Sequence, residues 1–357
     1  MSILGLGASL YGAAATWRRR WYVRHPERRR HPHRPVISIG NLSVGGTGKT
    51  PITAALARLL IAQGELPSIL SRGYRRAVAP KGVTIVSNGR TIRATLDTAG
   101  DEPLMLARAL PTVPVLVGRN RYVSARFAEE RLGVTVHLLD DGFQHLELVR
   151  DVDLLVVRPE DLGDRVLPAG RLREPVTVAS VADAVLVHAS RDAAAEDLAR
   201  SLGVATWFRV ERRLGEPWWF TNDDGTVAPG TRVVGVAGVA RPDAFFQDLS
   251  ARGWDVVATM PFPDHHRFSI DDTRRIETTA RSAGAIVMTT EKDAVRLEGC
   301  GFGRVPIAVL PLAMSVEPEA RFAGWLAARL AAARDGGANP VPAAPPRPGR
   351  PGPSPGA

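Results

Sequence analysis

The chain has 357 residues, a hydrophobic fraction of 45% and a formal net charge of +9, which is enough for two domains or for one large α/β domain with an appendage. Its only cysteine is Cys300, which excludes a disulfide framework or a cysteine-based zinc site within one chain and is typical of a reducing compartment. Residues 1–34 carry eight arginines, one acid and no lysine, so the rest of the chain is nearly neutral. A nucleic-acid enzyme more often spreads basic residues over its body, so nucleic acid is not an expected partner.

The first 34 residues divide into an apolar run over residues 1–17 and a basic run over residues 18–34. The apolar run has no signal-peptide cleavage pattern, contains three glycines and is shorter than the roughly 20 residues of a spanning helix. We therefore expect a helix at a membrane surface, with Trp17, Trp21 and Tyr22 at headgroup level and the arginines against anionic lipid. The alternatives are a helix packed on the core and a nucleic-acid-binding arm, which no aromatic-studded sheet motif supports.

Residues 35–203 alternate short apolar runs with longer helical patterns, which is typical of a parallel sheet with helices on both faces. The predicted strands are 36–40, 68–71, 83–86, 114–117, 135–139, 153–157 and 184–188. The predicted helices are 50–63, 102–110 and 119–132. This range is therefore predicted to form an α/β core.

The remaining sequence predicts three further parts. Residues 204–232 alternate in character and contain a DDG turn, which favours an antiparallel ribbon or small hairpin that joins two halves. Residues 233–334 return to the α/β pattern and predict a second, smaller lobe. Its predicted strands are 232–240, 254–262, 285–290 and 306–312, and its predicted helices are 242–252, 271–283 and 318–334. Residues 335–357 contain eight prolines and predict a disordered tail.

A phosphate-binding loop is predicted between the first strand and the first core helix. In such a loop glycines turn backbone N–H groups toward phosphate oxygens, a lysine neutralises charge, and a serine or threonine hydroxyl reaches Mg²⁺. The loop consists of Ser43, Val44, Gly45, Gly46, Thr47, Gly48, Lys49 and Thr50. Ser43 stands where the usual pattern has a glycine, and the pair Gly45-Gly46 compensates, as in a subset of such loops. The loop predicts a nucleoside triphosphate site.

An acidic pair follows a second apolar run. Asp140 and Asp141 end the predicted strand 135–139, and Gly142 then turns the chain. Ligands of an open parallel sheet gather at the carboxyl ends of its strands, and a nucleotide site needs an acid there to hold Mg²⁺ or its waters. The pair therefore predicts a metal-organising position, and the sequence leaves open which of the two aspartates is the ligand.

Eight short motifs follow one another along the chain: SIGNLSVGGTGKTP, SRGYRR, GDEP, GRNR, LDDGFQH, LPAGRLREP, PDHHRFS and TTEKDAVRL. In this order they resemble the motifs of the tetraacyldisaccharide 4'-kinase family, the lipid A 4'-kinases. The resemblance extends from about residue 1 to residue 330, and only the proline-rich tail lies outside it.

The resemblance implies a fold, a reaction and a location. The fold would be a P-loop NTPase-like parallel sheet core with a smaller α/β lobe joined by a β ribbon. The reaction would transfer the γ-phosphate of ATP, with Mg²⁺, to the 4'-hydroxyl of a tetraacylated glucosamine disaccharide 1-phosphate, giving lipid IVA. The expected location is the cytoplasmic face of the bacterial inner membrane, peripheral or monotopic on its anionic surface, and no protein partner is evident.

The resemblance also assigns roles to particular residues. Lys49 would contact the β- and γ-phosphates, Thr50 would bind Mg²⁺ with Asp140 or Asp141, and Gln144 would lie near the nucleotide. Asp101 would be the catalytic base and His265 its partner, although helix capping by Asp101 and participation of the adjacent His266 remain open. The motifs GRNR and GRLREP supply expected substrate-site residues, whose arginines suit the substrate 1-phosphate or the ATP phosphates, with surface salt bridges as the alternative: Arg119, Arg121, Arg171, Arg173 and Glu174.

Two rival functions fit parts of the sequence. A GTP-driven metal chaperone or a carboxylase-like synthetase would share the double-glycine loop, but metal chaperones usually have Cys/His clusters, and this chain has no C-x-x-C. The segment TEKD comes near a guanine-reading motif without matching it. A membrane-docked ATP-binding scaffold is the non-enzymatic alternative, and the presence of Asp101 and His265 speaks against it.

Overall fold

The structure is a computed structural model that describes residues 3–74, 76–221, 225–303 and 305–336. Its core is a nine-stranded sheet in the order β14-β8-β7-β6-β1-β5-β2-β4-β3. The core strands are β1 Val36–Asn41, β2 Pro67–Ser71, β3 Thr84–Asn88, β4 Pro114–Val117, β5 Val136–Asp140, β6 Val152–Val157, β7 Ala184–Val187, β8 Trp207–Leu214 and β14 Leu312–Glu317. All neighbouring pairs are parallel except β3 with β4 and β14 with β8, at the two edges. The predicted parallel α/β core is confirmed.

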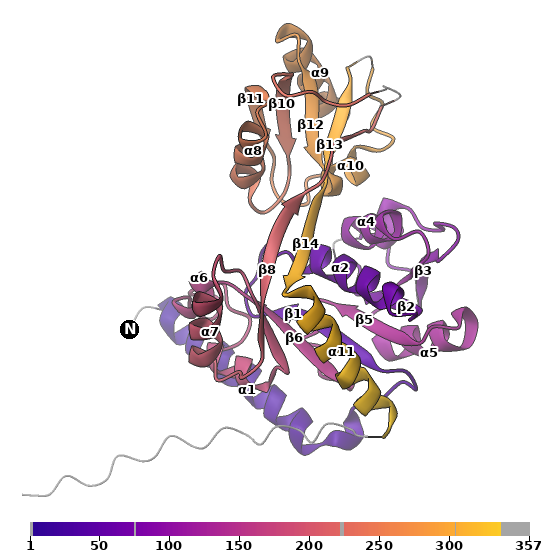
Figure 1. Cartoon of the computed structure of the whole chain (residues 1–357), viewed down its shortest axis with the longest axis vertical. Coiled ribbons are helices and arrows are strands. Elements are labelled where there is room, and N and C mark those ends of the chain that lie inside the picture. The colour runs from indigo at the N-terminus through magenta and orange to yellow at the C-terminus, as the bar shows by residue number, and fades with distance from the viewer. Residues whose placement is uncertain (1–2, 75, 222–224, 304, 337–357) are drawn as a thin grey trace, which may run out of the picture.

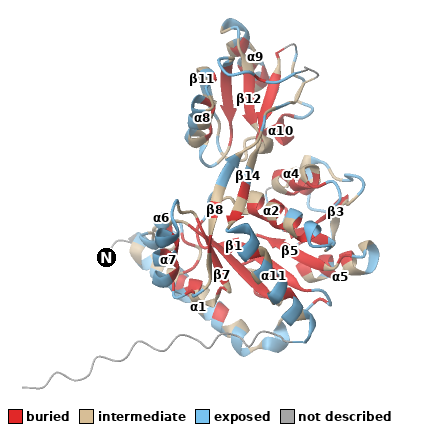
Figure 2. Ribbon diagram, viewed as in Figure 1, coloured by how far each residue is buried: buried red, intermediate tan, exposed pale blue. Residues whose placement is uncertain are grey.

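Helices cover both faces of this sheet, so its central strands are buried. Strands β1 and β6 are buried along their whole length, as expected of parallel strands with covering helices. The helices and 3₁₀ turns of the core are α2 Lys49–Ala62, α3 Leu96–Ala99, α4 Asp101–Ala109, α5 Arg121–Leu132, α6 Pro159–Leu162, η2 Val176–Val181, α7 Asp192–Ser201 and α11 Glu319–Arg334. Figure 2 shows the buried strands enclosed by helices whose outer faces are exposed.

The second lobe has its own five-stranded sheet in the order β11-β10-β12-β13-β9. Its strands are β9 Trp218–Trp219, β10 Arg232–Ala237, β11 Asp255–Pro261, β12 Ile286–Thr290 and β13 Ile307–Leu310. Its helices are α8 Pro242–Ala251, α9 Ile270–Ser282 and α10 Glu291–Leu297. Aromatic residues such as Phe245, Phe246 and Trp254 fill one face of this sheet, and Phe268 and Ile276 fill the other.

The predicted hairpin within residues 204–232 is wrong. Strand β8 pairs antiparallel with β14, about a hundred positions further along the chain, from Leu214 with Leu312 to Arg209 with Glu317. The short β9 pairs with β13 instead, and residues 222–224 of the expected turn lie outside the described residues. The hydrophobic alternation identified a strand correctly, but alternation carries no information about which strand is its partner.

The antiparallel strands β8 and β14 thus form the ribbon that joins the two lobes (Figure 1). The predicted strand 306–312 is in fact two strands, because Pro311 interrupts it and the chain passes there from the second lobe into the core sheet. Beside this point the Gly215 N–H donates to the Pro311 carbonyl at 3.0 Å. The smaller lobe therefore rests on the core through two hydrogen-bonded strands.

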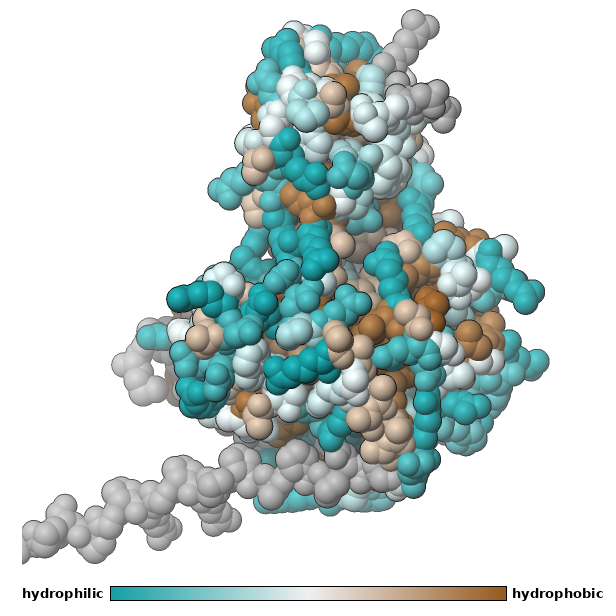
Figure 3. Space-filling model, viewed as in Figure 1, coloured by the Kyte–Doolittle hydropathy of each residue, from teal (hydrophilic) through white to brown (hydrophobic). Residues whose placement is uncertain are grey.

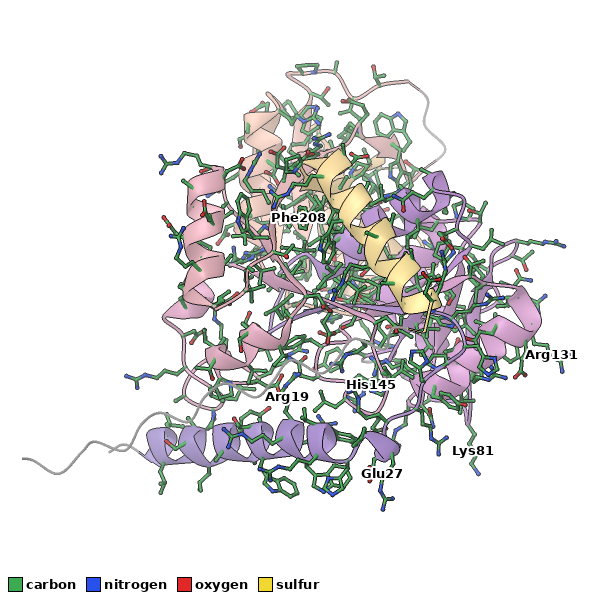
Figure 4. All side chains as sticks on the ribbon, turned by 60° about the horizontal axis from the view of Figure 1, so that its bottom comes forward. Arg19, Glu27, Lys81, Arg131, His145 and Phe208 are labelled. Carbon is green, nitrogen blue, oxygen red and sulfur yellow. The ribbon has the colours of Figure 1, made fainter. Side chains whose placement is uncertain are left out.

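The N-terminal segment forms a long helix, α1 Ile3–Arg24, followed by the 3₁₀ turn η1 Pro26–Arg28. Figure 4 shows α1 lying along the core lobe, with Arg19 on the side that faces the core and Glu27 just beyond the helix. Gly7 and Gly12 are on the side of α1 that faces the core, since a Cβ on Gly7 would be 3.4 Å from Pro168 and one on Gly12 would be 3.7 Å from Pro175, both ordinary packing distances.

Candidate active site

The loop after β1 has the conformation of a phosphate-binding loop. Gly45 and Gly48 have φ angles of 114° and 84°, which residues with a Cβ rarely adopt. Contacts from neighbouring strand ends support the loop: the Val44 N–H donates to the Arg171 carbonyl at 2.8 Å, and His188 Nε2 lies 2.9 Å from the Thr47 carbonyl. The conformation leads directly into α2, whose first residue is Lys49, so the helix N-terminus faces the loop.

Lys49 is held at the base of this loop. Its ammonium donates to Asn41 Oδ1 at 2.8 Å and lies 3.5 Å from Asp141 Oδ1. Thr50 is buried beside it and lines the same cleft. Asn41, the last residue of β1, therefore orients the lysine, a role that the sequence motif did not reveal.

The two acids at the end of β5 have different surroundings. Asp141 has a φ of 55° and receives two hydrogen bonds from Arg173 Nη1, at 2.8 and 2.9 Å. Burial alone would raise the pKa of Asp141, but the Lys49 and Arg173 cations outweigh it and hold this pKa below its ordinary value. Asp140 accepts a hydrogen bond from the Thr53 hydroxyl, at 3.2 Å, and burial, with Glu102 and Asp141 nearby, raises its pKa to about 7.

The side-chain oxygens of Thr50, Asp140 and Asp141 are suitable ligands for Mg²⁺. This ion takes one or two carboxylates, waters and substrate phosphates rather than a closed protein cage. A carboxylate with a raised pKa is one whose charge is poorly compensated, and a cation beside Asp140 would compensate it. The Thr47 hydroxyl is also buried without a hydrogen-bond partner. Among the described residues, no group of three or more His, Cys, Asp or Glu side chains could hold a metal ion.

Asp101 and His265 come together from the two lobes. Asp101 begins α4 in the core, His265 follows β11 in the second lobe, and His265 Nδ1 lies 2.8 Å from Asp101 Oδ2. His265 has a φ of 63°, uncommon for a residue other than glycine. Burial alone would raise the pKa of Asp101, but the His265 hydrogen bond and the Lys292 charge lower it below its ordinary value. The imidazole lines the cleft, with Asp101 behind it.

His266 belongs to a different group. Its Nε2 lies 3.0 Å from Asp272 Oδ2, and Asp272 forms the N-terminal capping box of α9 with Ser269. The side chain of His266 also stacks on Phe262, with ring centroids 4.9 Å apart. The structure thus separates the two adjacent histidines, since His265 faces Asp101 and His266 stabilises the start of a helix.

Two cations of α10 complete the surroundings of Asp101. Lys292 Nζ lies 3.9 Å and Arg296 Nε 3.6 Å from Asp101 Oδ2. Arg296 also donates to the Gly238 carbonyl at 2.9 Å. Both residues belong to the motif TTEKDAVRL, which predicted no role for either of them. The motif TTEKDAVRL was the available signal, because its lysine and arginine are four positions apart on one helix face.

The predicted arginines occupy different positions. Arg119 and Arg121 line the cleft, and buried Arg121 donates to His145 Nδ1 at 3.2 Å. Burial and the neighbouring arginine charges lower the pKa of His145 to about 3, which keeps its ring neutral and able to accept this bond. Arg173 pairs with Asp141 in the cleft, whereas Arg171 pairs with Asp164 at 2.7 Å on the surface.

Glu174 and Gln144 connect the site to the N-terminal helix. Glu174 accepts two hydrogen bonds from Arg19, at 2.7 and 3.0 Å, and both side chains are buried. Gln144 donates to the Asn41 carbonyl at 3.0 Å and to Glu174 at 3.3 Å. Glu174 therefore lies beside the predicted nucleotide loop, but its carboxylate is neutralised by the helix rather than left open to a ligand.

A cleft of about 1610 Å³ lies between the two lobes and α1. The phosphate loop, the acidic pair, His265 and the cleft arginines line it, and α1 contributes Tyr11, Ala14, Ala15 and Arg18. Figure 3 shows a largely hydrophilic outer surface on the face in view, with hydrophobic residues gathered near the junction of the lobes. The cleft can therefore accommodate a nucleotide and a second, larger molecule that reaches it past α1.

Comparison with known proteins gives consistent matches. The sequence model of a family described as tetraacyldisaccharide-1-P 4'-kinase matches residues 2–331. The tetraacyldisaccharide 4'-kinase of Geobacter sulfurreducens is 40% identical over 305 residues, which cover 83% of this chain and 84% of that protein. The corresponding protein of Geobacter metallireducens is 41% identical over 268 residues, covering 74% and 79%.

A solved structure matches at the level of the whole fold. The crystal structure described as the "apo" form of LpxK from Aquifex aeolicus in complex with ATP is similar with a TM-score of 0.72 and 30% sequence identity. The match covers 90% of this chain and 97% of that chain. Both lobes are therefore shared with a protein that was crystallised with ATP.

Proposed function

We propose that this chain, which belongs to the tetraacyldisaccharide-1-P 4'-kinase family, transfers the γ-phosphate of ATP to the 4'-hydroxyl of a tetraacylated glucosamine disaccharide 1-phosphate. The product would be lipid IVA, an intermediate of lipid A biosynthesis. The observation that carries the proposal is the convergence of the phosphate loop at Lys49, the acidic pair at Asp140 and the Asp101–His265 pair on one cleft.

The phosphate loop would bind the nucleotide. Lys49 would exchange its contacts with Asn41 and Asp141 for the β- and γ-phosphates, and the N-terminus of α2 would add its dipole. Release of Lys49 would leave Asp141 paired with Arg173 alone. Catalysis of this type depends on positioning and on electrostatic stabilisation of the transferred phosphoryl group rather than on covalent chemistry.

Magnesium would be held by Thr50 and by the acidic pair. Asp140 is the better candidate for the direct ligand because its carboxylate accepts from the neutral Thr53 hydroxyl, whereas Asp141 is paired with the Arg173 cation. Asp141, already paired with Arg173, would then act through water. When bound, the metal would neutralise charge that develops on the phosphate oxygens.

The acceptor hydroxyl would meet His265. The ring lies between Asp101 and the cleft, so we place Nε2 at the hydroxyl proton and Asp101 at Nδ1, where it orients the ring and stabilises its charged form. As the hydroxyl oxygen bonds to the γ-phosphorus and the bond to the bridging oxygen of ADP breaks, Nε2 accepts the hydroxyl proton. This order refines the sequence expectation, in which Asp101 itself was the base.

The N-terminal helix would bring the enzyme to its lipid substrate. None of the helices within the described residues is long and apolar enough to cross a membrane. Helix α1 nevertheless exposes Leu6, Leu10 and Trp17, at 54%, 65% and 67%, while Tyr11 and Arg18 of the same helix line the cleft. A helix that faces both lipid and cleft suits a substrate whose acyl chains stay in the bilayer, and we place the protein at the cytoplasmic face of the inner membrane.

The direct test uses the purified full chain with ATP, Mg²⁺ and a tetraacyl disaccharide 1-phosphate in detergent. We expect a product with one added phosphate at the 4' position, identified by mass spectrometry and phosphorus NMR. Lys49→Ala should lower kcat by at least about 10²-fold, since a single preorganised cationic or hydrogen-bond donor to the transition state contributes that much. Lys81→Ala, an exposed lysine elsewhere, should not change it. Product phosphorylated at another position would overturn the proposal.

A further inference from the structure

Lysine is rare in this chain. Of its 46 lysines and arginines, only Lys49, Lys81 and Lys292 are lysines. Lys81 is exposed, Lys49 lies in the phosphate loop, and Lys292 is largely buried in the second lobe, with its side chain 16% exposed. A lysine is a compact point charge with three donors, and arginine does not reproduce that geometry. The position of Lys292 therefore calls for a chemical explanation.

The Lys292 ammonium makes three close contacts. It lies 3.2 Å from Glu102 Oε1, 3.3 Å from Asp264 Oδ1 and 3.3 Å from His265 Nε2. Burial alone would lower the pKa of Lys292, but the carboxylates of Glu102, Asp101 and Asp264 outweigh it and raise this pKa above its ordinary value. Lys292 is therefore a charged ammonium with three protons to donate.

The contact with His265 determines the form of the imidazole ring. An ammonium has no lone pair, so His265 Nε2 must be the acceptor and cannot carry a proton while this contact exists. The single ring proton then lies on Nδ1, 2.8 Å from Asp101 Oδ2, and is donated to that carboxylate. A doubly protonated ring would place an N–H group against the ammonium, which is repulsive.

The charged groups around the ring are mostly acidic. The charged and titratable groups that surround the Lys292–His265 contact are Asp101 and Glu102 of α4, Asp264 of the loop after β11, Asp293 and Arg296 of α10, and Tyr74, whose ring centroid lies 5.7 Å from that of His265. Carboxylates outnumber cations in this group. Among these groups of the described residues, Arg296 is the one cation besides Lys292.

We propose that Lys292 is a positioning residue for phosphoryl transfer: it donates to Nε2 of His265, fixes the Nδ1–H form against Asp101, and keeps Nε2 unprotonated until the acceptor hydroxyl replaces it as the donor. The inference rests on the proposed function for the role of His265 as proton acceptor. Its structural part, the protonation state of one ring, does not depend on activity.

The first test is nuclear magnetic resonance of the full chain with ¹⁵N-labelled histidine at pH 7, with the His265 signals assigned by their loss in His265→Gln. We expect a protonated Nδ1 and an unprotonated Nε2 in the wild type and in the control Lys81→Met. Lys292→Met should show a ring protonated at both nitrogens. An unchanged His265 spectrum in Lys292→Met overturns the proposal, and so does a wild-type ring that is protonated at Nε2.

The second test is the pH profile of kcat/KM for the acceptor. In Lys292→Met the acidic limb of this profile should move to higher pH by about 1 unit, because one neighbouring charge produces an effect of that size. On that limb kcat/KM should therefore be about tenfold lower than in the wild type, and it should recover at alkaline pH. Glu102→Gln removes a partner of Lys292 in the core lobe but keeps the contact with His265, so its limb should not move in the same direction.

The outcomes distinguish the positioning role of Lys292 from the proposed role of His265 in the reaction. A loss in Lys292→Met that is equal at all pH values, or that Glu102→Gln reproduces, would mean that Lys292 only holds the lobes together and would overturn its positioning role. Full activity in His265→Gln would instead remove His265 from the proposed reaction, while the NMR result would still report whether Lys292 controls the ring.

Discussion

Single residues in the cleft have partners that a sequence pattern cannot supply. His265 and His266 are neighbours in the chain, yet one contacts Asp101 across 164 positions and the other caps α9 through Asp272. His265 has a positive φ, and its side chain contacts Asp101 of the core lobe. The two histidines, between which the sequence left the choice open, thus have different partners in the structure.

At this scale we predict coupled effects of Asp101→Asn and His265→Gln on kcat. Each substitution should lower kcat by about 10²-fold or more, because a positioned acid–base group contributes about 10²–10⁴-fold. The double variant should be only slightly worse than the more damaged single variant, because the pair acts as one unit. Steady-state assays of the three variants with circular dichroism spectra as a folding control test this. Losses that multiply would show that the two side chains act independently.

Elements are joined by buried charge pairs at two places. Helix α1 is tied to the core through Arg19 and Glu174, whose side chains are 9% and 5% exposed. The segment after α1 is tied by Glu129 of α5, which accepts from the Arg34 N–H at 2.7 Å and contacts His137 Nε2 at 3.2 Å. Both carboxylates are paired within the protein, so removal of one partner leaves a buried charge.

For the first pair we predict that Arg19→Met destabilises the protein by about 3–5 kcal/mol, the usual effect of leaving a buried charge without its partner. Arg19→Met combined with Glu174→Met should be less destabilising, since neither charge then remains. The free energy of unfolding from urea titrations measures both. The reverse order of stability would mean that α1 is held by its glycine contacts with Pro168 and Pro175 rather than by this pair.

For Glu129 we predict that Glu129→Gln lowers the free energy of unfolding by an amount that depends on pH. Burial alone would raise the pKa of Glu129, but the hydrogen bonds from His137 and the Arg34 N–H outweigh it and lower this pKa to about 2. A carboxylate with a lowered folded-state pKa stabilises the protein above its unfolded-state pKa, near 4.5, and this contribution is lost as the pH falls toward 2. Urea titrations should therefore show a constant difference in unfolding free energy above about pH 5 that shrinks below it. A difference that does not change with pH would exclude ionisation of Glu129 as its cause.

At the scale of the whole molecule, α1 and the ribbon determine how the cleft is placed. Helix α1 lies against the core next to the cleft, and its exposed apolar residues Leu6, Leu10 and Trp17 follow one another at helical spacing. The ribbon of β8 and β14 carries the second lobe (Figure 1). His265 of that lobe contacts Asp101 at the start of α4. The orientation of α1 at a membrane would therefore also orient the opening of the cleft.

We predict that Leu6→Gln, Leu10→Gln and Trp17→Gln together release the protein from anionic vesicles without disturbing the contacts that α1 makes with the core. The remaining arginines are each worth about 1 kcal/mol near an anionic surface and should leave weak, salt-sensitive binding. Sedimentation with vesicles at low and high salt measures this. The matched control replaces Leu66, Val78 and Ile92, which are also exposed apolar residues, with glutamine. Equal loss of binding in the control would mean that α1 is not the anchor.

The sequence by itself determined the parts of this protein whose physics is local. The glycine-rich loop between a buried strand and a helix, the acids at the end of β5 and the alternation of strands and helices all depend on neighbours within a few positions, so composition and spacing reveal them. Tertiary structure alone decided the pairing of β8 with β14, the separation of His265 from His266, and the pairing of Glu174 with Arg19 across 155 positions. These contacts join segments that are distant in the chain, and their energy comes from burial and charge compensation in the folded state, which leave no periodic signal in the sequence.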